Sequence, residues 1–233
     1  MKSYRLPAFT LCVLFMTLVP AHADGVLVFG GTGRLGSEIV KQLFNASETE
    51  VTVFARPTSN RSRLDSFDVT FAAGDALNEA DIELAMKANN FSVVINALAS
   101  RIDAPNKTFY ETTQANISKW AKETGVGRVI LNSAVGAGDS SIAYPDNMRS
   151  MFGDILKDKE NAENNLMKSG LEYAIIRNFR ILPETTPITG KAHLTEDRMA
   201  TGGIGRADLG ILNVYCVDGY LCKNKIFHAI GPD

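Results

Sequence analysis

Three glycines at regular spacing form the clearest chemical feature of the sequence. Gly30, Gly33 and Gly36 make a GxxGxxG pattern directly after an apolar run that ends at Phe29. In a nucleotide-binding turn, such glycines allow a sharp bend, close approach of a pyrophosphate, and tight packing of helix on strand. The free N–H groups of the helix start then face the phosphates. A purely structural turn is the alternative. The other turn residues expected to contact a dinucleotide are Thr32, Arg34 and Leu35.

The residue that ends the next apolar run predicts which dinucleotide binds. An NAD-selective site carries Asp or Glu about 20 residues after the turn, whereas this sequence has Arg56, 20 positions after Gly36. A guanidinium fork suits the 2′-phosphate of NADP. Arg61 and Arg63 stand just downstream and could add to this pocket. The alternative is that all are solvated loop arginines; the pattern favours NADP, with NAD as the weaker candidate.

Further candidates stand where other strands should end, because ligands of open α/β sheets lie beyond the carboxyl ends of the strands. Asp75 and Ala76 follow the third predicted strand. Asp75 is expected to accept from the adenine amino group, or else to cap a turn. Ser133 would lie near the nicotinamide, or cap the segment that follows it. The residues expected to let the adenosine ribose approach are Ala97, Leu98 and Ala99.

The elements that must position these residues alternate short apolar runs with longer amphipathic stretches. Such a pattern is typical of buried parallel strands covered by helices. Gly125 and Gly170 are placed as helix stops. The predicted strands are 25–29, 50–55, 68–73, 91–97, 127–132 and 172–177. The predicted helices are about 34–45, 61–66, 78–89, 106–125 and 147–169. The fold class is therefore α/β, a Rossmann-type doubly wound parallel sheet.

The alternation of apolar runs and amphipathic stretches ends after Arg177, where Pro183 and Pro187 interrupt it. A short pair of strands is expected around 188–195 and 201–204, then a helix at 206–217 and a strand at 225–230. No repeat or linker divides the chain, so residues 24–233 are expected to form one NAD(P)-binding domain. Residues from about 178 to 233 would contribute a small C-terminal cap on the substrate side.

The first 23 residues have the composition of a targeting segment. Lys2 and Arg5 precede an apolar run over 8–19, which ends at Pro20 and the triplet Ala21-His22-Ala23. This order predicts a signal peptide, residues 1–23, and export to a periplasm, a secretory lumen or the extracellular space. A retained anchor is the alternative, but the run is shorter than the roughly 20 residues that span a bilayer. No stable membrane span is expected after removal.

Charge and cysteine content limit the partners of the predicted mature chain. The whole chain has 24 Lys and Arg against 26 Asp and Glu, and removing Lys2 and Arg5 leaves a net charge near −4 with no basic block. This balance argues against nucleic acid. Cys216 and Cys222 either form a disulfide in an oxidising compartment or stay as buried thiols. No metal site is expected from so few scattered ligands, and nothing indicates an oligomeric state.

Segments spread over nearly all of the mature chain carry a family resemblance. They are GGTGRLG at 30–36, Arg56, GDALN at 74–78, RVILNSAVGAG at 128–138 and KENAENNLMKSGLEYAIIR at 159–177. The chain resembles the atypical short-chain dehydrogenase/reductase family, in the NAD(P)-binding branch that includes flavin reductase (biliverdin-IXβ reductase) and NmrA-like redox sensors. The resemblance implies that Lys159 holds the nicotinamide ribose and supplies positive charge. The alternative is a solvated helix lysine.

One departure from that family bears on the mechanism. Ile155 stands four positions before Lys159, where the YxxxK tyrosine belongs, and Tyr144 is fifteen positions away. Without that proton donor, ketone reduction loses a contribution of about 10² to 10⁴ in rate. Hydride transfer to a planar acceptor needs less help, because charge spreads over its ring. The candidate catalytic residues are Ser133 and Lys159, and the acceptor pocket candidates are Phe179, Arg180 and Leu182.

The sequence therefore favours an NADPH-dependent oxidoreductase acting on a small planar electron acceptor such as a flavin, a quinone or a tetrapyrrole. A non-catalytic NAD(P)-binding redox sensor or assembly factor is the alternative, since it would use the same turn and Arg56 without a proton donor. A nucleotide-sugar epimerase or dehydratase is less favoured, because it needs the tyrosine and a larger substrate domain. Export conflicts with all three readings, since dinucleotides are scarce outside the cytosol.

Overall fold

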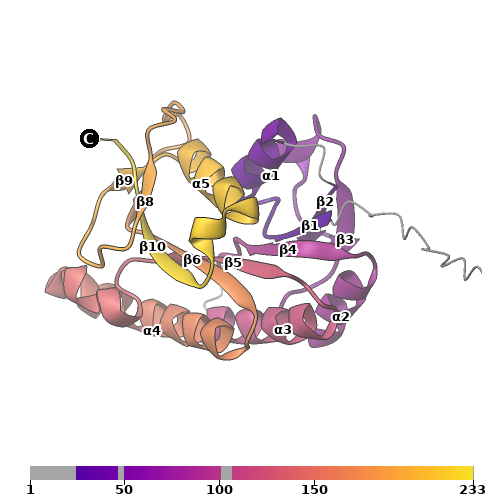
Figure 1. The fold of residues 1–233 in the computed structure, drawn as a ribbon, viewed down its shortest axis with the longest axis horizontal. Helices are drawn as coiled ribbons and strands as arrows, with labels where there is room; N and C mark the ends of the chain where they lie inside the picture. The colour runs from indigo at the N-terminus through magenta and orange to yellow at the C-terminus, as the bar shows by residue number, and fades with distance from the viewer. Residues whose placement is uncertain (1–24, 47–49, 101–106, 233) are drawn as a thin grey trace, which may run out of the picture.

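A computed structural model describes residues 25–46, 50–100 and 107–232 of the chain, so the predicted signal peptide lies outside the described residues. An eight-stranded sheet runs through the centre in the order β3-β2-β1-β4-β5-β6-β10-β8 (Figure 1). The strands are β1 (Gly25–Phe29), β2 (Val51–Ala55), β3 (Thr70–Ala73), β4 (Phe91–Asn96), β5 (Arg128–Ala134), β6 (Glu172–Asn178), β8 (His193–Thr195) and β10 (Lys225–Ile230). Every neighbouring pair is parallel except β10 with β8.

Helices cover both faces of this sheet. Helices α1 (Arg34–Ala46) and α5 (Arg206–Asp218) lie on one face, and α2 (Glu79–Lys87), α3 (Phe109–Glu123) and α4 (Asp146–Lys168) lie on the other (Figure 1). Successive side chains of a strand point to opposite faces. In β1, Val26 and Val28 therefore join the core under α1 and α5, while Leu27 and Phe29 join the core over α2, α3 and α4. This arrangement confirms the predicted doubly wound Rossmann-type fold.

The sequence predicted helix ends correctly where a glycine is required by the backbone conformation. Gly125 and Gly170, the predicted helix stops, have φ of 76° and 81°, a left-handed conformation in which glycine is favoured. The predicted helix at 61–66 is wrong, because only a short 3₁₀ turn forms over Ser62–Leu64. That turn starts on a hydrogen bond from the Ser62 N–H to Asn60 Oδ1 (2.9 Å) and buries Leu64. One apolar anchor is too little to extend it into a helix.

The strands predicted around 188–195 and 201–204 do form, but they do not pair with each other as expected. Strand β8 adds antiparallel to β10 at the edge of the large sheet, whereas β9 (Gly203–Ile204) pairs in parallel with β7 (Arg180–Ile181). Each short strand thus completes a backbone edge that would otherwise lack hydrogen bonds. The segment after 178 also supplies β10 and α5 to the main layers, so it builds the sheet as well as its cap.

The end of α5 is held by a covalent bond and by a buried cation. Cys216 and Cys222 are joined by a disulfide, and both side chains are fully buried. Arg128, from β5, donates to the carbonyl oxygens of Cys216, Val217 and Gly219 at 2.5, 3.1 and 3.1 Å. These carbonyls belong to a helix C-terminus, where a cation is stabilising.

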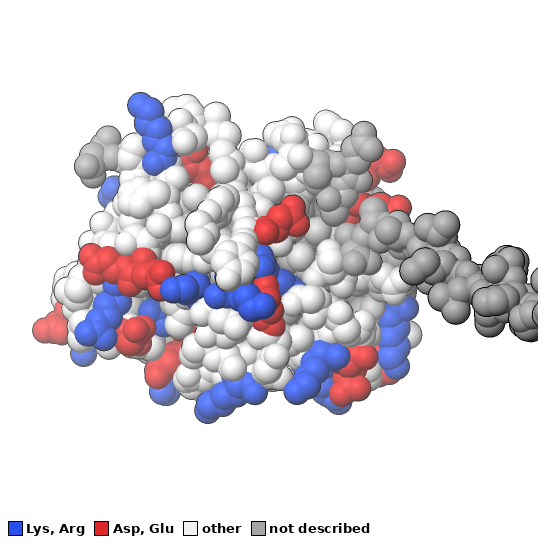
Figure 2. All heavy atoms as spheres, viewed as in Figure 1, with Lys and Arg blue, Asp and Glu red and all other residues white. Residues whose placement is uncertain are grey.

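Charged side chains of both signs share the surface. On the face shown in Figure 2, Lys and Arg side chains lie among Asp and Glu side chains along the lower edge, over α3 and α4. Within the described ranges, no helix combines the length and apolar character needed to cross a membrane. The described residues also include no group of three or more His, Cys, Asp or Glu side chains that could hold a metal ion.

Candidate functional site at the carboxyl ends of the strands

A cavity of about 690 Å³ opens beyond the carboxyl ends of β1, β2, β4 and β5. Here the strand order reverses between β1 and β4, which is where ligands bind in sheets of this kind. From the glycine turn, Gly30, Thr32, Gly33, Arg34 and Leu35 line it. From the other strand ends come Arg56, Asp75, Ala76, Ala97, Leu98 and Ala99. Ser133 and Lys159 lie at the same cavity. The structure therefore brings the sequence candidates together, apart from Gly36, Arg61, Arg63 and the proposed acceptor residues.

The glycines of the turn serve two different purposes. Gly30 has φ of 77°, and a Cβ there would lie 2.7 Å from Ala97 O. A Cβ on Gly36 would lie 2.2 Å from Gly30 O, so Gly36 lets α1 begin against the turn and does not line the cavity. At Gly33 an added Cβ would meet a single protein atom within 4 Å, Gly30 O at 3.1 Å. Gly33 therefore keeps the cavity side of the turn clear for a ligand, as a dinucleotide requires.

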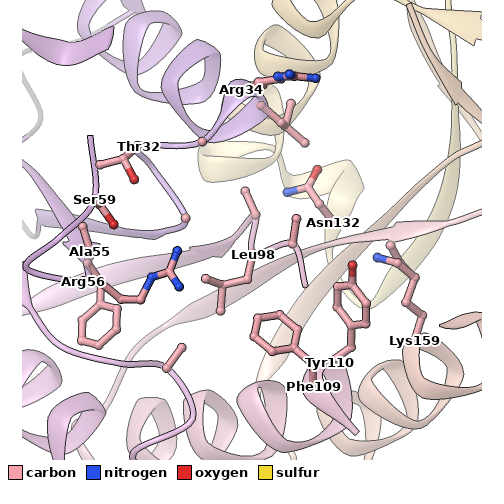
Figure 3. Close-up of a pocket in the computed structure, with 18 of the residues that line it drawn as sticks. Thr32, Arg34, Ala55, Arg56, Ser59, Leu98, Phe109, Tyr110, Asn132 and Lys159 are labelled. Carbon is pink, nitrogen blue, oxygen red and sulfur yellow. The ribbon is translucent and has the colours of Figure 1, made fainter. Parts of the chain in front are cut away.

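Arg56 ends β2 in one corner of the cavity, with Thr32 and Ser59 beside it (Figure 3). Its side chain is exposed, and within the described ranges it has no carboxylate partner. A turn closed by the Ser59 N–H and Arg56 O (2.9 Å) brings the Ser59 hydroxyl to this corner. Ser59 was missed from the sequence, because a serine three residues after a strand carries no distinguishing signal.

The other arginines near this corner have partners of their own. Arg61 stacks on the Phe71 ring, 4.2 Å from its centroid. Glu184 bridges Arg34 (2.7 Å from Nε) and Arg63 (2.9 Å from Nη1). Arg61 and Arg63 do not line the cavity, so the expectation that they add to a phosphate pocket is wrong. Arg34, Arg56 and Arg206 are the arginines that line it.

Asp75 caps a turn, which was the alternative to its expected adenine contact, and it also lines the cavity. Its Oδ1 accepts from the Leu77 N–H at 3.0 Å, which caps the turn after β3. Its own N–H donates to Asp81 Oδ2 at 2.8 Å. One carboxylate oxygen thus fixes the loop, and the residue still lines the cavity. Its predicted adenine contact stays a prediction.

Lys159 lies at the opposite end of the cavity. The alternative prediction, that it is a solvated helix lysine, is wrong. Its Nζ lies 3.9 Å from the centroid of the Tyr110 ring. Burial lowers the pKa of Lys159 to about 8, although Glu163 and Asp158 partly oppose this shift. The solvated lysine of this stretch is Lys157, whose ammonium pairs with Glu160 at 2.9 Å.

Ser133 supplies an unsatisfied hydroxyl at the cavity. Its Oγ is buried and has no hydrogen-bond partner among the described residues, so it does not cap the segment after β5. A buried hydroxyl without a partner is costly in a folded protein. The cost is recovered if a ligand bonds to it, and the carboxamide or ribose of a nicotinamide dinucleotide has suitable groups. This orphan hydroxyl and the cleared side of Gly33 fit such a cofactor.

Tyr110, at the start of α3, is a site residue that the sequence reasoning missed. It lines the cavity with Phe109, and its polar end and that of Lys159 lie close together (Figure 3). Ile155, at the position of the absent tyrosine, is exposed and does not line the cavity. Tyr144 packs edge-on against Phe179, with ring centroids 5.6 Å apart.

The predicted acceptor residues are displaced by one position. Phe179, Arg180 and Leu182 do not line the cavity, whereas Asn178 and Ile181 do. Side chains alternate between the two sides of an extended chain. An error of one residue therefore selects a side chain that points away from the cavity in place of one that faces it. Asn132 and Arg206 also line the cavity.

A family model described as NAD(P)H-binding matches residues 30–218. The chain belongs to this NAD(P)H-binding family. The match runs from the glycine turn through α5 and therefore includes both ends of the cavity. Membership confirms the recognition made from the sequence, an NAD(P)-binding Rossmann-like oxidoreductase branch.

Solved structures agree on the fold. An anaerobillin reductase, ChuY, from Escherichia coli O157:H7 has a TM-score of 0.78 and 24% identity, over 90% of this chain and 98% of that chain. A short-chain dehydrogenase/reductase from Veillonella parvula, solved in complex with NADP, has a TM-score of 0.69 and 17% identity, over 90% and 95%. The enzyme WbmH of Bordetella bronchiseptica, solved with NAD⁺, has a TM-score of 0.66 and 17% identity, over 84% and 72%.

A curated relative matches a shorter part of the chain. It is the decarboxylating sterol-4-alpha-carboxylate 3-dehydrogenase of Saccharomyces cerevisiae, 25% identical over 123 residues. The match covers 48% of this chain and 35% of the yeast enzyme, so the chain spans about a third of that relative's length.

Proposed function

We propose that this NAD(P)H-binding chain is an NADPH-dependent oxidoreductase that transfers hydride to a small planar acceptor. One observation carries the proposal. A single cavity joins the glycine turn and Arg56 at one end to Ser133, Tyr110 and Lys159 at the other. A dinucleotide is long enough to need both ends, and its reactive ring would then lie among groups that can bond an acceptor.

The adenosine end of the cavity has the groups that favour NADPH over NADH. Arg56 is a charged donor without a carboxylate partner in the described ranges, and the hydroxyls of Thr32 and Ser59 lie in the same corner (Figure 3). Charge-assisted bonds from such groups match a 2′-phosphate. Position 56 carries no carboxylate to accept from the free ribose hydroxyls of NAD.

The other end suits an acceptor with a delocalised ring. A reduced nicotinamide, when bound, supplies a hydride. Phe109, Leu98 and Ile181 give this part of the cavity apolar surface on which a flat ring can lie. Lys159 adds a positive charge at this end, which stabilises negative charge as it develops on the acceptor. The reductase and NADP-bound relatives of the same fold support the proposal.

A non-catalytic redox sensor or assembly factor is the second candidate. The observation that favours it is Ile155, which leaves α4 without the tyrosine that normally protonates a product. Such a module would bind the same dinucleotide in the same cavity. Turnover of NADPH is therefore the property that separates the two functions.

The test uses the purified chain and two successive measurements. Binding of NADPH and NADH is followed by the fluorescence of the reduced nicotinamide, and oxidation of NADPH is then assayed with FMN and with a soluble quinone. We expect tighter binding of NADPH and oxidation with at least one acceptor. Tight binding without turnover would favour the sensor, and absence of binding to both dinucleotides would reject both functions.

A matched pair of glycine variants shows whether binding occurs in this cavity. Gly33→Asp adds a charged side chain on the side that the turn keeps clear, so it should abolish binding of both dinucleotides. Gly153→Asp is the control, because a Cβ at Gly153 on α4 meets no atom within 4 Å. If both variants bind NADPH as the unchanged protein does, the glycine turn is not the dinucleotide site.

A further inference from the structure

We propose that Tyr110, from the start of α3, donates the proton that completes reduction of the acceptor, in place of the tyrosine that α4 lacks. The inference rests on the proposed function, because a proton donor has a role only where hydride is transferred. It assigns a catalytic hydroxyl to a residue outside the YxxxK pattern, paired with the lysine that the pattern retains.

The first support is the contact between Tyr110 and Lys159. The ammonium of Lys159 lies over the Tyr110 ring, 3.9 Å from its centroid. Both residues line the cavity, and Figure 3 shows the Lys159 amine next to the Tyr110 side chain although the two come from different helices. An ammonium above an aromatic face is held by a cation–π attraction, and it would stabilise a phenolate formed beside it.

The second support is the hydrogen bond that the phenol makes. The Ser100 N–H donates to the Tyr110 hydroxyl oxygen at 3.2 Å. The hydroxyl is the acceptor in this bond, so its own proton is available for donation. Burial raises the pKa of Tyr110, which keeps the phenol protonated in neutral solution. A donor must hold its proton until the acceptor takes it.

The third support is the anchoring of Tyr110 to α4. Asp158, which is buried, accepts from the backbone N–H groups of Tyr110 and Glu111, both at 2.8 Å. These N–H groups belong to the first turn of α3 and have no partner within the helix. Since Asp158 immediately precedes Lys159, one residue of α4 positions the tyrosine and the next supplies the ammonium. Asp158 is a positioning residue.

The same anchor is reinforced one turn further along α4. Asn161 Nδ2 donates to Glu111 Oε2 at 2.9 Å, and Asn165 Nδ2 donates to Glu111 O at 3.3 Å. The start of α3 is therefore held at several points along α4. A phenol held in this way needs no reorganisation before it donates, which is the condition for efficient proton transfer.

The proposed step balances in atoms and electrons. The acceptor gains a hydride, and thus two electrons, from the reduced dinucleotide bound in the same cavity. The O–H bond of Tyr110 breaks, and its proton forms a bond to the nitrogen or oxygen of the acceptor that holds the new electron pair. The phenolate then takes a proton from the Lys159 ammonium, which solvent restores. The acceptor leaves with two more hydrogens, and the dinucleotide leaves oxidised.

The test compares Tyr110→Phe with Tyr144→Phe in the full chain, with NADPH and FMN. Tyr144 is the matched control, because it packs on Phe179 outside the cavity. Tyr110→Phe should lower kcat by about 100-fold or more, the usual contribution of a general acid, and leave the affinity for NADPH unchanged. FMN bound without NADPH should show a several-fold weaker affinity, since one hydrogen-bond donor is lost. Tyr144→Phe should change none of these quantities.

The outcomes separate this inference from the proposed function. If the unchanged protein reduces FMN and Tyr110→Phe keeps kcat within twofold, the inference is wrong and the proposed function stands. If the unchanged protein binds NADPH but reduces neither FMN nor a quinone, the proposed function fails, and proton donation by Tyr110 fails with it.

A second variant covers the case in which Tyr110→Phe does not fold. Incorporation of 3,5-difluorotyrosine at position 110 keeps the ring and the hydroxyl and makes the phenol more acidic. The solvent deuterium isotope effect and kcat should both change, while NADPH affinity stays the same. Values of kcat and of the isotope effect equal to those of the unchanged protein would overturn the inference.

Discussion

Arg56 and Lys159 stand at opposite ends of one cavity, and their surroundings prepare them for different tasks. Arg56 follows a strand end, is exposed, and has no carboxylate partner in the described ranges. Lys159 is partly buried and lies over an aromatic ring. The Arg56 guanidinium is thus accessible to a phosphate, whereas burial disfavours the Lys159 ammonium and lowers the pKa of this lysine to about 8.

Replacing Arg56 tests which dinucleotide the site prefers. Arg56→Asp should weaken NADPH binding by at least tenfold, because a hydrogen bond to a charged group contributes about 1.5–3 kcal/mol, and should leave NADH binding close to its original value. Titration of both dinucleotides by fluorescence measures this. Arg61→Asp is the control, since Arg61 stacks on Phe71 and does not line the cavity. Equal losses for both dinucleotides in Arg56→Asp would reject a phosphate role.

The lowered pKa of Lys159 predicts how activity depends on pH. Its ammonium is present at pH 7 and is lost as the pH rises through about 8, so kcat with FMN should fall along a single ionisation near that pH. Lys159→Met should have low activity and no such limb. A rate that stays level to pH 10 in the unchanged protein would contradict a role for this charge.

The same shift has a consequence for stability. The folded pKa of about 8 lies below the ordinary 10.5, so folding favours the neutral amine and the charged form destabilises the fold. This penalty is fully present below pH 8 and disappears as the pH rises toward 10.5. Lys159→Met should therefore raise the free energy of unfolding at pH 7, as urea denaturation can measure.

At the scale of elements, α4 connects the sheet to the site. Its Glu163 accepts from Arg177 of β6, from Nε at 3.0 Å and from Nη2 at 2.6 Å, and both side chains are buried. Arg177 Nη1 also donates to Asp139 Oδ1 at 2.6 Å, in the 3₁₀ turn Gly138–Ala143. The pair fixes α4 one turn beyond Lys159, so packing far from the ligand determines where that lysine lies.

Breaking this pair should destabilise the protein strongly. Glu163→Gln leaves the buried guanidinium without its main counter-charge, and loss of one partner of a buried ion pair costs about 3–5 kcal/mol. Asp139→Asn removes the other, exposed partner of Arg177 and should cost under about 1 kcal/mol. Denaturant unfolding of both variants measures the difference. Similar losses would mean that Arg177 does not depend on Glu163.

The elements also show how far sequence patterns reach. Apolar runs predicted the six strands of the main series. The signal is strongest in β1 and β2, which are buried along their whole length, because a strand buried on both faces must be apolar throughout. The pairing of β8 and β9 was mispredicted, because strands of two or three residues carry no pattern that selects a partner. The predictions of a phosphate role for Arg61 and Arg63 and of the acceptor residues were wrong for a related reason. The contacts of these residues depend on which side of a loop or strand each side chain faces.

For the whole molecule, we propose export, with the mature chain starting at Asp24. The proposal is supported by the signal-like segment 1–23 and by the Cys216–Cys222 disulfide, since disulfides persist in oxidising compartments. Protein recovered from its native host should have the mass of residues 24–233, and its thiols should react with an alkylating agent only after reduction. A full-length chain in which Cys12, Cys216 and Cys222 all react without reduction would contradict export.

The disulfide should also contribute to global stability. Changing Cys216 and Cys222 together to Ser should lower the free energy of unfolding by about 2 kcal/mol, the chain-entropy value for so short a loop. Urea denaturation of this variant and of the unchanged protein measures the loss. NADPH affinity should stay the same, because neither cysteine lines the cavity. Equal stabilities would show that Arg128 alone suffices to hold the end of α5.

The sequence by itself determined the features that neighbouring residues create together. The glycine turn, the strand ends that supply Arg56 and Ala97, and the fold class follow from local backbone geometry and from the period of burial. Only the tertiary structure decided which distant groups meet. Tyr110 and Asp158 are 48 residues apart in the chain, and α3 meets α4 because both cover one face of the sheet. Side-chain packing between helices, which no single segment encodes, brings the phenol to Lys159.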